Sequence, residues 1–179
     1  MKEIKITKND SGQRFDKFLL KYFDKAPKSF IYKMMRKKRI KLNGGKADGN
    51  ETLAEGDTVQ MYLSEDTVDG FREKKSISTV ERKFEIVYED KNIIIVDKPA
   101  GVLSHAESKN DKDTLIDQIL SYLYSKKEYV PENENSFVPA LCNRLDRNTS
   151  GIVVIGKTAE AVRKLNEAVK NKRIRKLYM

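Results

Sequence analysis

The sequence predicts an α+β protein in two parts: a small helix-helix-β domain, followed by a domain with a mixed, mainly antiparallel sheet. Two observations carry this prediction. Apolar residues recur at intervals of three and four in several segments, which indicates amphipathic helices. Short alternating or continuous apolar runs lie between these segments, as is typical of strands. The polar stretch SEDTVDGFREKKSISTV has no periodicity, so we expect domains at 1–63 and 81–179 with a linker over 64–80.

The first domain begins with two predicted helices. Spacing at i, i+3, i+4, i+7 and i+8 places five apolar side chains on one face: Phe15, Phe18, Leu19, Tyr22 and Phe23. Pro27 suits the start of the second helix, whose apolar stripe consists of Phe30, Ile31, Met34 and Met35. The alternating segments Ile40–Leu42 and Thr58–Leu63 then predict a small sheet, with a tight-turn signal from Asn43 to Gly45.

The second domain opens with a predicted hairpin. Its strands are Phe84–Tyr88 and Ile93–Val96, and the second is apolar throughout, which is typical of a buried strand. Thr114 with Asp117 three residues later forms a capping-box pattern and predicts a helix start. The inward side chains of that helix are Leu115, Ile116, Ile119, Leu120 and Leu123.

The remaining elements of the second domain follow the same logic. Residues 125–136 are polar and predict a loop, and Ile152–Ile155 predicts another buried strand. Thr158 is the predicted cap of a last helix, whose apolar face consists of Ala161, Val162, Leu165, Ala168 and Val169. The final residues from Arg173 onward predict the beginning of a further strand.

The chain is strongly basic: of 179 residues, 36 are Lys or Arg and 27 are Asp or Glu, which gives a formal net charge of +9. Residues 1–63 hold 15 of the cations and 8 of the acids. Such a balance favours an acidic partner, with nucleic acid the commonest and a membrane surface the alternative. No apolar segment approaches the roughly 20 residues that cross a bilayer, and the charged N-terminal residues do not indicate a signal peptide.

Cysteine and histidine occur once each, as Cys142 and His105. An intrachain disulfide is therefore impossible, which fits a reducing compartment, and we expect a cytoplasmic protein. With so few ligands, a structural zinc site is not expected. A His105-dependent hydrolase stays open as an interpretation, since Ser150, His105 and an aspartate could meet in space. The adjacent Ser104 is a poor partner, because neighbours in an extended chain point to opposite sides.

Six cations lie within nine residues, on the second predicted helix and just past it: Lys33, Arg36, Lys37, Lys38, Arg39 and Lys41. Charged helix faces are usually only solvated. A cluster this dense without an acid repels itself, however, and a polyanion would neutralise it. We therefore predict that these six residues, called the basic cluster below, bind RNA or DNA.

The segments around the basic cluster resemble the alpha-L RNA-binding domain, which is typified by the fourth protein of the small ribosomal subunit. The resemblance runs over Arg14–Leu19, Lys38–Gly45 and Glu55–Val59. It implies that the first domain contacts RNA rather than DNA or a membrane surface.

The second domain places one carboxylate, Asp146, between Arg144 and Arg147 in the stretch CNRLDRNTSG, directly before a predicted strand. A structural ion pair in a turn is the plainer interpretation, because Asn-Thr-Ser-Gly is ordinary turn chemistry. The alternative is catalytic, since neighbouring guanidinium groups favour the ionised carboxylate that a nucleophile or base requires. No second carboxylate lies nearby in sequence, which disfavours a glycosidase pair.

The stretch RLDRNTSG before an apolar strand resembles the signature of the large-subunit ribosomal RNA pseudouridine synthase family. Two other stretches support the resemblance: Tyr88–Gly101 is similar to the family's opening motif, and Lys176-Leu-Tyr178 is similar to its Lys-x-Tyr motif. A basic N-terminal domain with a linker also matches common members, so the resemblance covers nearly the whole chain.

This resemblance implies an isomerase that converts specific uridines of structured RNA, in particular large-subunit ribosomal RNA, to pseudouridine without a cofactor or metal. Asp146 would be the essential carboxylate, and Arg144 would help to hold the target nucleotide out of its stack. Tyr178 would pack against the uracil, and Lys176 would add positive charge. We expect a monomer that does not associate with a membrane. An RNA-binding module with a catalytically idle second domain stays open as the alternative.

The sequence departs from the family's pattern in two ways. The residue before the motif's first arginine is often His, and here it is Asn143. The family's catalytic domain also continues well beyond Lys-x-Tyr and adds strands and a basic residue that pairs with the catalytic aspartate, whereas this sequence ends at Met179. We therefore expect a chain that is truncated within the catalytic domain and is inactive, or nearly so, by itself.

Overall fold

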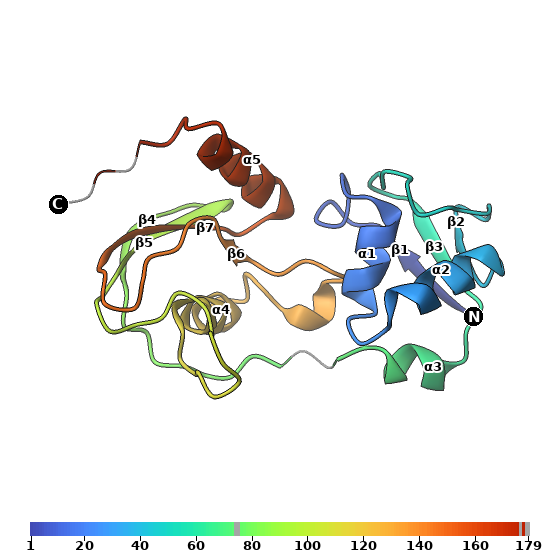
Figure 1. The fold of residues 1–179 in the computed structure, drawn as a ribbon, viewed down its shortest axis with the longest axis horizontal. Coiled ribbons are helices and arrows are strands. Elements are labelled where there is room, and N and C mark those ends of the chain that lie inside the picture. Colours follow the sequence, from blue (N-terminus) through green and yellow to red (C-terminus); the bar gives the residue numbers. More distant parts are fainter. Residues whose placement is uncertain (74–75, 176, 178–179) are drawn as a thin grey trace. The chain divides into compact units, whose positions relative to one another are not determined.

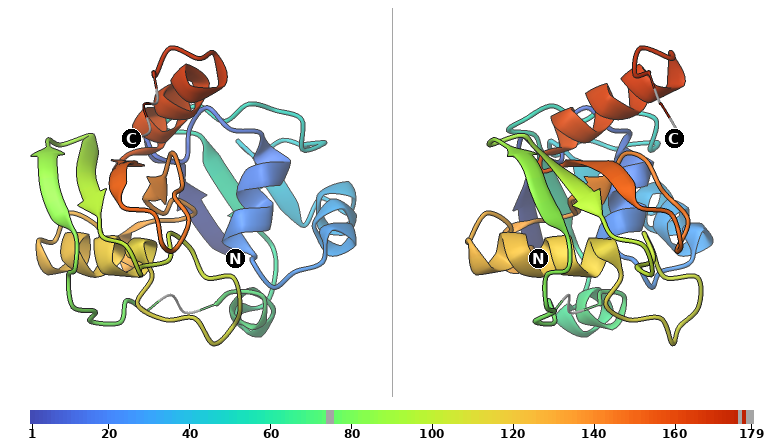
Figure 2. Two further views of the ribbon diagram at one scale, coloured as in Figure 1. Left: turned by 60° about the vertical axis from the view of Figure 1, so that its left-hand side comes forward. Right: turned by 90° about the vertical axis from the view of Figure 1, so that its left-hand side faces the viewer.

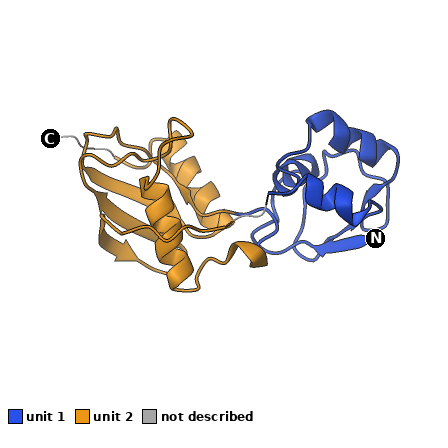
Figure 3. Ribbon diagram, turned by 90° about the horizontal axis from the view of Figure 1, so that it is seen from below, with its two compact units in different colours: residues 1–75, 134–137 blue, residues 76–133, 138–179 orange. Residues whose placement is uncertain are grey.

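A computed structural model describes residues 1–73, 76–175 and 177. The chain divides into two compact units, residues 1–75 with 134–137 and residues 76–133 with 138–179 (Figure 3). Over the described residues the chain forms five α-helices and two antiparallel sheets. The predicted α+β class is therefore confirmed, while the domain boundaries predicted above stay a prediction.

The first unit is a three-stranded antiparallel sheet with helices packed on one face (Figure 1). The strands lie in the order β1-β3-β2, with β1 at Lys2–Lys5, β2 at Ile40–Leu42 and β3 at Thr58–Met61. Helices α1 (Phe15–Tyr22) and α2 (Lys28–Arg36) are the two predicted from their apolar stripes.

The core of the first unit forms because both helices direct their apolar stripes at the same face of the sheet. Its buried side chains include Phe15, Phe18, Leu19, Ile31 and Met35 from the helices, and Ile4, Ile40, Val59 and Met61 from the strands. Burying a side chain of this size contributes about 1.5–3 kcal/mol. The opposite face of the sheet is left to alternate residues such as Lys41 and Gln60, which lie opposite each other.

Two elements of the first unit were not predicted. Strand β1 lies in the charged N-terminal stretch, and Ile4 is the only buried residue among its four. Helix α3 (Glu65–Gly70) lies inside the predicted linker. Ser64 caps it by accepting a hydrogen bond from Thr67 N at 3.3 Å, and Val68 packs into the core. Six residues are too few for a recognisable helical period.

The second unit is built on a four-stranded antiparallel sheet in the order β4-β5-β7-β6. Its strands are β4 (Glu85–Glu89), β5 (Ile93–Lys98), β6 (Ala140–Leu141) and β7 (Gly151–Gly156). The predicted hairpin and the predicted strand at 152–155 are confirmed, whereas the two-residue β6 was not predicted.

Helices α4 (Leu115–Ser125) and α5 (Ala159–Lys170) lie on opposite faces of this sheet (Figure 2). The capping box that opens α4 is confirmed: Asp117 N donates to Thr114 Oγ1 at 3.4 Å, and Thr114 N donates to Asp117 Oδ2 at 3.0 Å. Apolar side chains of α4 and of β5 and β7 form the core of the unit, among them Ile119, Leu123, Ile94, Val96, Val153 and Ile155.

The last helix begins where the sequence predicts it. Thr158 caps α5 by accepting a hydrogen bond from Ala161 N at 3.2 Å. Gly156 lets the helix approach β7 closely, because a Cβ on this glycine would lie 2.8 Å from the Val162 nitrogen. The strand predicted from Arg173 is not formed over residues 173–175. No helix in the described part of the chain is long and apolar enough to cross a membrane.

Candidate functional site

Asp146 lies in the loop between β6 and β7, and its side chain is exposed. The loop is a turn in which Thr149 N donates to Asp146 O at 3.1 Å. Just before it, Asn143 extends the pairing with β7: its side chain accepts from Val154 N at 2.8 Å and donates to Ile152 O at 3.0 Å. The asparagine that departs from the family's pattern therefore has a structural role, since its amide satisfies two backbone groups of β7.

Ser104 holds the residue before Asp146. This serine is buried, and its hydroxyl donates to Leu145 O at 2.6 Å while accepting from Leu145 N at 3.2 Å. One side chain therefore satisfies both backbone groups of Leu145. The hydroxyl proton is engaged with the Leu145 carbonyl in this way, so Ser104 is not placed as a nucleophile.

Lys98 and Gly101 hold the residue after Asp146. The Lys98 ammonium is buried and donates to three carbonyl oxygens, those of Pro99 at 3.0 Å, Val102 at 2.7 Å and Arg147 at 3.2 Å. Gly101 N donates to the same Arg147 oxygen at 2.8 Å, from a backbone with φ +89° that favours glycine. The segment 98–104 therefore fixes the backbone on both sides of Asp146.

The Asp146 carboxylate does not pair with its flanking arginines. Arg147 instead directs its guanidinium to Asp111, at 3.7 Å, and Arg144 is exposed. Asp111 is a ready partner because Glu107 N and Ser108 N hold its carboxylate at 3.0 and 2.7 Å. The expected pairing of guanidinium groups with Asp146 is therefore wrong for Arg147, and in the described part of the chain Asp146 forms no ion pair.

The charge of Asp146 nevertheless acts on Lys98. Burial lowers the pKa of Lys98, and the negative charge of Asp146 opposes that shift. The two charged groups therefore influence each other, although the Lys98 ammonium donates its hydrogen bonds to backbone carbonyl oxygens.

His105 is half-buried next to Ser104. Its pKa is lowered by burial and by the positive charge of Arg144, while Asp117 acts in the opposite direction. Over residues 1–73, 76–175 and 177, His105 makes no hydrogen bond to a serine or an aspartate. The arrangement that a Ser-His-Asp hydrolase requires is thus not present in this part of the chain.

Of the other residues proposed from the resemblance, Lys176 and Tyr178 lie outside the described residues. Arg144 and Asp146 lie on the same loop, two residues apart, and are both exposed. Within the described ranges, no group of three or more His, Cys, Asp or Glu side chains comes together as metal ligands would.

The basic cluster lies at the C-terminal end of α2, in the turn that follows it, and, for Lys41, in β2. Five of its members are exposed, and Lys41 is half-buried. Lys38 adopts a left-handed backbone with φ +57° and donates its N–H to Met35 O at 2.9 Å, which ends the helix. Cations at the C-terminal end of a helix also interact favourably with the helix dipole. Among the described residues, however, no carboxylate pairs with any of the six.

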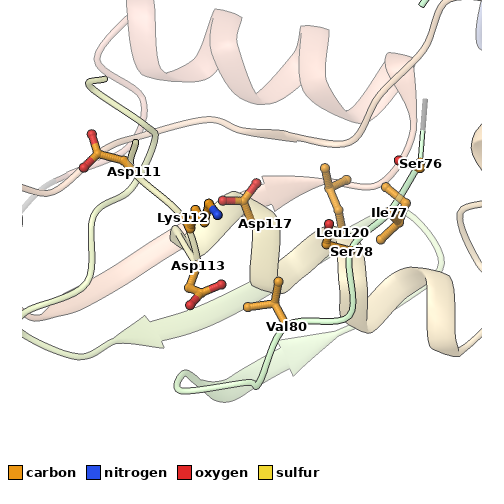
Figure 4. A pocket seen from close by; sticks show the side chains of 9 residues that line it. All are labelled: Ser76, Ile77, Ser78, Val80, Asp111, Lys112, Asp113, Asp117 and Leu120. Atoms are coloured by element: carbon orange, nitrogen blue, oxygen red, sulfur yellow. The ribbon is translucent and has the colours of Figure 1, made fainter. Parts of the chain in front are cut away.

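A hollow of about 350 Å³ lies between residues 76–80 and the start of α4 (Figure 4). Three aspartates line it, Asp111, Asp113 and Asp117. Asp117 is engaged in the helix cap, and Asp111 is engaged with backbone N–H groups and Arg147. An acidic lining does not suit a phosphate-bearing ligand, so the hollow is not a candidate nucleic-acid site.

The sequence indicates Asp146 but not the residues that hold its backbone, Ser104 and Lys98. Ser104 was considered only as a nucleophile, and Lys98 only as part of a motif. The available signal was weak: Lys98 ends an apolar run that becomes a buried strand, which places a cation where burial is expected.

Residues 92–179 match the sequence pattern of a family described as RNA pseudouridylate synthase. An uncharacterized RNA pseudouridine synthase of Mycoplasma capricolum is 38% identical over 182 residues, which cover 99% of this chain and 58% of the relative. The ribosomal large subunit pseudouridine synthase C of Haemophilus influenzae is 29% identical, with 100% of this chain and 53% of the relative covered. The protein of the same name in Escherichia coli is 30% identical at the same coverage.

Among solved structures, the human RNA pseudouridylate synthase domain containing 4 has a TM-score of 0.37 and 23% sequence identity. That comparison covers 49% of this chain and 30% of the human chain. The chain spans about half the length of the curated relatives that it matches.

Proposed function

We propose that this chain acts as an RNA pseudouridine synthase with Asp146 as its essential carboxylate, because residues 92–179 match the family described as RNA pseudouridylate synthase. The proposed substrate is large-subunit ribosomal RNA. Relatives named ribosomal large subunit pseudouridine synthase C support this substrate, because they align with the whole length of the chain.

The observation that carries the proposal is the contrast between the carboxylate of Asp146 and its backbone. The carboxylate is exposed, whereas Leu145 and Arg147 on either side are held by Ser104, Lys98 and Gly101. A reacting group must be held within about 3–3.5 Å of its target in a defined direction, and a fixed backbone supplies much of that order in advance. A surface carboxylate with only a structural role would not need two such supports.

In the proposed reaction, the bond between N1 of uracil and C1′ of ribose breaks and a bond between C5 and C1′ forms. The hydrogen on C5 leaves as a proton and N1 gains one, so substrate and product are isomers. Asp146 attacks C1′, adds to the uracil ring or removes a proton from the ribose. All three routes require the ionised carboxylate.

Arg144 is proposed to contact a phosphate of the target nucleotide, because its exposed guanidinium lies two residues from Asp146 on the same loop. The family resemblance adds Tyr178 as a planar neighbour for the extruded uracil and Lys176 as a further cation. Extrusion of a base costs a few kcal/mol. Phosphate contacts made by the basic cluster of the first unit would offset that cost, as the alpha-L resemblance of this unit suggests.

Tritium release tests this proposal. RNA transcribed with uridine tritiated at C5 loses its label to water when C5 bonds to the ribose, whereas RNA binding alone releases none. We expect release from a large-subunit ribosomal RNA transcript. Binding of the transcript without release would instead favour an RNA-binding module with a catalytically idle second domain.

The length of the protein matters for this assay, because the match covers only 58% of the Mycoplasma capricolum relative. The assay therefore uses the 179-residue chain and, beside it, the same chain followed by the remaining residues of that relative. We expect the 179-residue chain to be inactive, or nearly so, and the extended chain to release tritium. Equal turnover by both would contradict the expected need for the additional length.

A further inference from the structure

The first unit carries an exposed aromatic side chain beside its basic cluster. Tyr62 directly follows β3 and is 40% exposed. Its N–H donates to Arg39 O at 2.7 Å, which extends the pairing of β3 with β2 by one residue. Lys41 Nζ lies 5.2 Å from the centroid of the Tyr62 ring. Lys41 therefore lies beside the Tyr62 ring, and the backbone pairing places Arg39 opposite Tyr62. Tyr62, Arg39 and Lys41 are called the Tyr62 platform below.

The platform lies on the face of the sheet that the helices do not cover. Val59 and Met61 of β3 are buried in the core against α1 and α2, so the residues that alternate with them face the other way. Gln60 lies opposite Lys41 in the antiparallel register, and the contact of Lys41 with the Tyr62 ring places all three on this outer face. In the described part of the chain, Tyr62 does not belong to the hydrophobic core.

An exposed tyrosine by itself is ordinary. The surroundings of Tyr62 distinguish it, because Lys41 beside its ring and Arg39 opposite it have no carboxylate partner among the described residues. The nearest acid in the sheet register is Glu3, which lies across Gln60 on the β1 side. The platform is therefore confined to the β2 side of β3, next to the exposed residues Lys37 and Lys38.

We propose that Tyr62 stacks on an unpaired base of bound RNA while Arg39 and Lys41 contact the phosphates on either side of it. An aromatic ring for the base and cations for the backbone are the two elements by which proteins hold unpaired nucleotides. A regular duplex does not offer a base face to such a ring. The inference rests on the proposed RNA binding and adds to it the kind of RNA that the first unit holds: a single-stranded or bulged nucleotide.

Fluorescence tests the stacking directly, because the chain has no tryptophan. Tyr62→Trp introduces a single indole, and we expect its emission to be quenched when a ten-nucleotide oligouridylate is added. The matched control is Tyr124→Trp on α4, where the tyrosine is 44% exposed, and we expect no quenching there. Equal quenching of both, or of neither at concentrations where the oligonucleotide is bound, would overturn the stacking.

A second experiment separates base from phosphate. The oligouridylate is compared with an abasic strand of equal length, which keeps the phosphates and lacks the bases. Tyr62→Ala should weaken oligouridylate binding by about 5- to 150-fold and leave abasic binding unchanged. Equal effects on the two strands would overturn the proposal. Binding of ribosomal RNA but not of the oligouridylate would overturn the stacking alone, and binding of neither would overturn the proposed function as well.

Discussion

At the scale of single residues, Asp146 differs from the aspartates that hold the fold together. Asp16, for example, is buried and accepts hydrogen bonds from Tyr32 at 2.7 Å and from Arg14 at 2.9 Å. The side chain of Asp146 is exposed. The first kind of aspartate is needed for stability, whereas an exposed carboxylate on a fixed backbone is available for chemistry.

We predict that Asp146→Asn abolishes tritium release while RNA is still bound. The substitution keeps the size of the side chain and removes its charge, and a surface change of this kind usually alters stability by at most about 0.5 kcal/mol. Tritium release, RNA retention on filters and thermal unfolding are measured on a form of the chain that turns over. Asp69→Asn, at another exposed aspartate, is the control. Appreciable turnover by the Asp146 variant would refute the assignment.

Ser104 should affect turnover by positioning the backbone next to Asp146, rather than by contacting RNA. Ser104→Ala leaves the N–H and C=O of Leu145 without the partner that each now has, which costs roughly 1–3 kcal/mol when such groups are buried. We expect lower stability and slower turnover with little change in RNA affinity, and partial rescue by Ser104→Thr, which restores the hydroxyl.

The control for Ser104 is Ser125→Ala. Ser125 is exposed and donates a single hydrogen bond to Tyr122 O at 2.7 Å. Its replacement should therefore change the free energy of unfolding by at most about 0.5 kcal/mol. Urea unfolding gives the stability of each variant. Single-turnover rates, compared with RNA affinities, distinguish a misplaced Asp146 carboxylate from weaker RNA binding. A Ser104→Ala variant that is less stable but turns over at the full rate would mean that the serine holds the fold and not the reacting carboxylate.

At the scale of elements, Glu89 joins three parts of the second unit. It ends β4 and accepts hydrogen bonds from Tyr122 of α4 at 2.8 Å, from Lys126 just after α4 at 2.9 Å, and from Lys157 just after β7 at 3.0 Å. The Lys157 side chain is almost fully buried. The loop of Asp146 leads into the start of β7. The Glu89 network holds the other end of β7, through Lys157.

The Glu89 network should make stability depend on pH in the acid range. Burial alone would raise the pKa of Glu89, but the hydrogen bonds from Lys126, Lys157 and Tyr122 outweigh it and hold the pKa at about 2. A glutamate in an unfolded chain titrates near 4.3. Because the folded-state pKa is the lower one, the stabilisation is present above about pH 4.3 and is lost as the pH falls toward 2.

We predict that Glu89→Gln lowers the free energy of unfolding by roughly 2–3 kcal/mol at pH 7, and that this difference shrinks between pH 4 and pH 2. The figure allows for solvent screening at Lys126, which is partly exposed. Urea unfolding followed by circular dichroism at several pH values measures it. Glu85→Gln, an exposed residue of the same strand, should show little effect at any pH. A loss that stays constant down to pH 2 would contradict the ionic origin.

Long elements with a clear period were predictable, and short ones were not. Helices α1, α2, α4 and α5 have apolar stripes, and α2, α4 and α5 also have recognisable starts. Strands β5 and β7 contain continuous apolar runs, so local sequence determines these elements. Strand β1 has one buried residue, and β6 has two residues in all. These strands form because a partner strand supplies their hydrogen bonds, and no local pattern contains that information.

The candidate site divides in the same way. The stretch around Asp146 carries its own turn chemistry and could be found from the sequence. Its supports could not, because Ser104 and Leu145 are 41 residues apart and Lys98 and Arg147 are 49 residues apart. The ion pair of Arg147 with Asp111 could not be predicted for the same reason. The sequence suggested Asp146 as the partner because it is adjacent, but the fold brings Arg147 to Asp111 instead.

At the scale of the whole molecule, the excess positive charge is concentrated in residues 1–63, which hold 15 Lys or Arg against 8 Asp or Glu and include the exposed basic cluster. If these side chains contact RNA phosphates, each contact releases counterions and adds about −0.7 to −0.9 to the slope of log affinity against log salt. We predict that the triple variant Arg36→Gln, Lys37→Gln, Arg39→Gln binds RNA more weakly and flattens that slope by roughly 2 to 3.

A loss of three positive charges anywhere would weaken RNA binding somewhat, so the control must remove the same charge elsewhere. Lys83→Gln, Lys91→Gln, Lys127→Gln does so at three exposed positions of the second unit. Both variants should stay folded by circular dichroism, because Arg36, Lys37 and Arg39 lie outside the core. The cluster variant should weaken unrelated RNA sequences about equally, since phosphate contacts position rather than specify. Equal slopes for the two variants would mean that the cluster is a solvated surface and that RNA binds elsewhere on the protein.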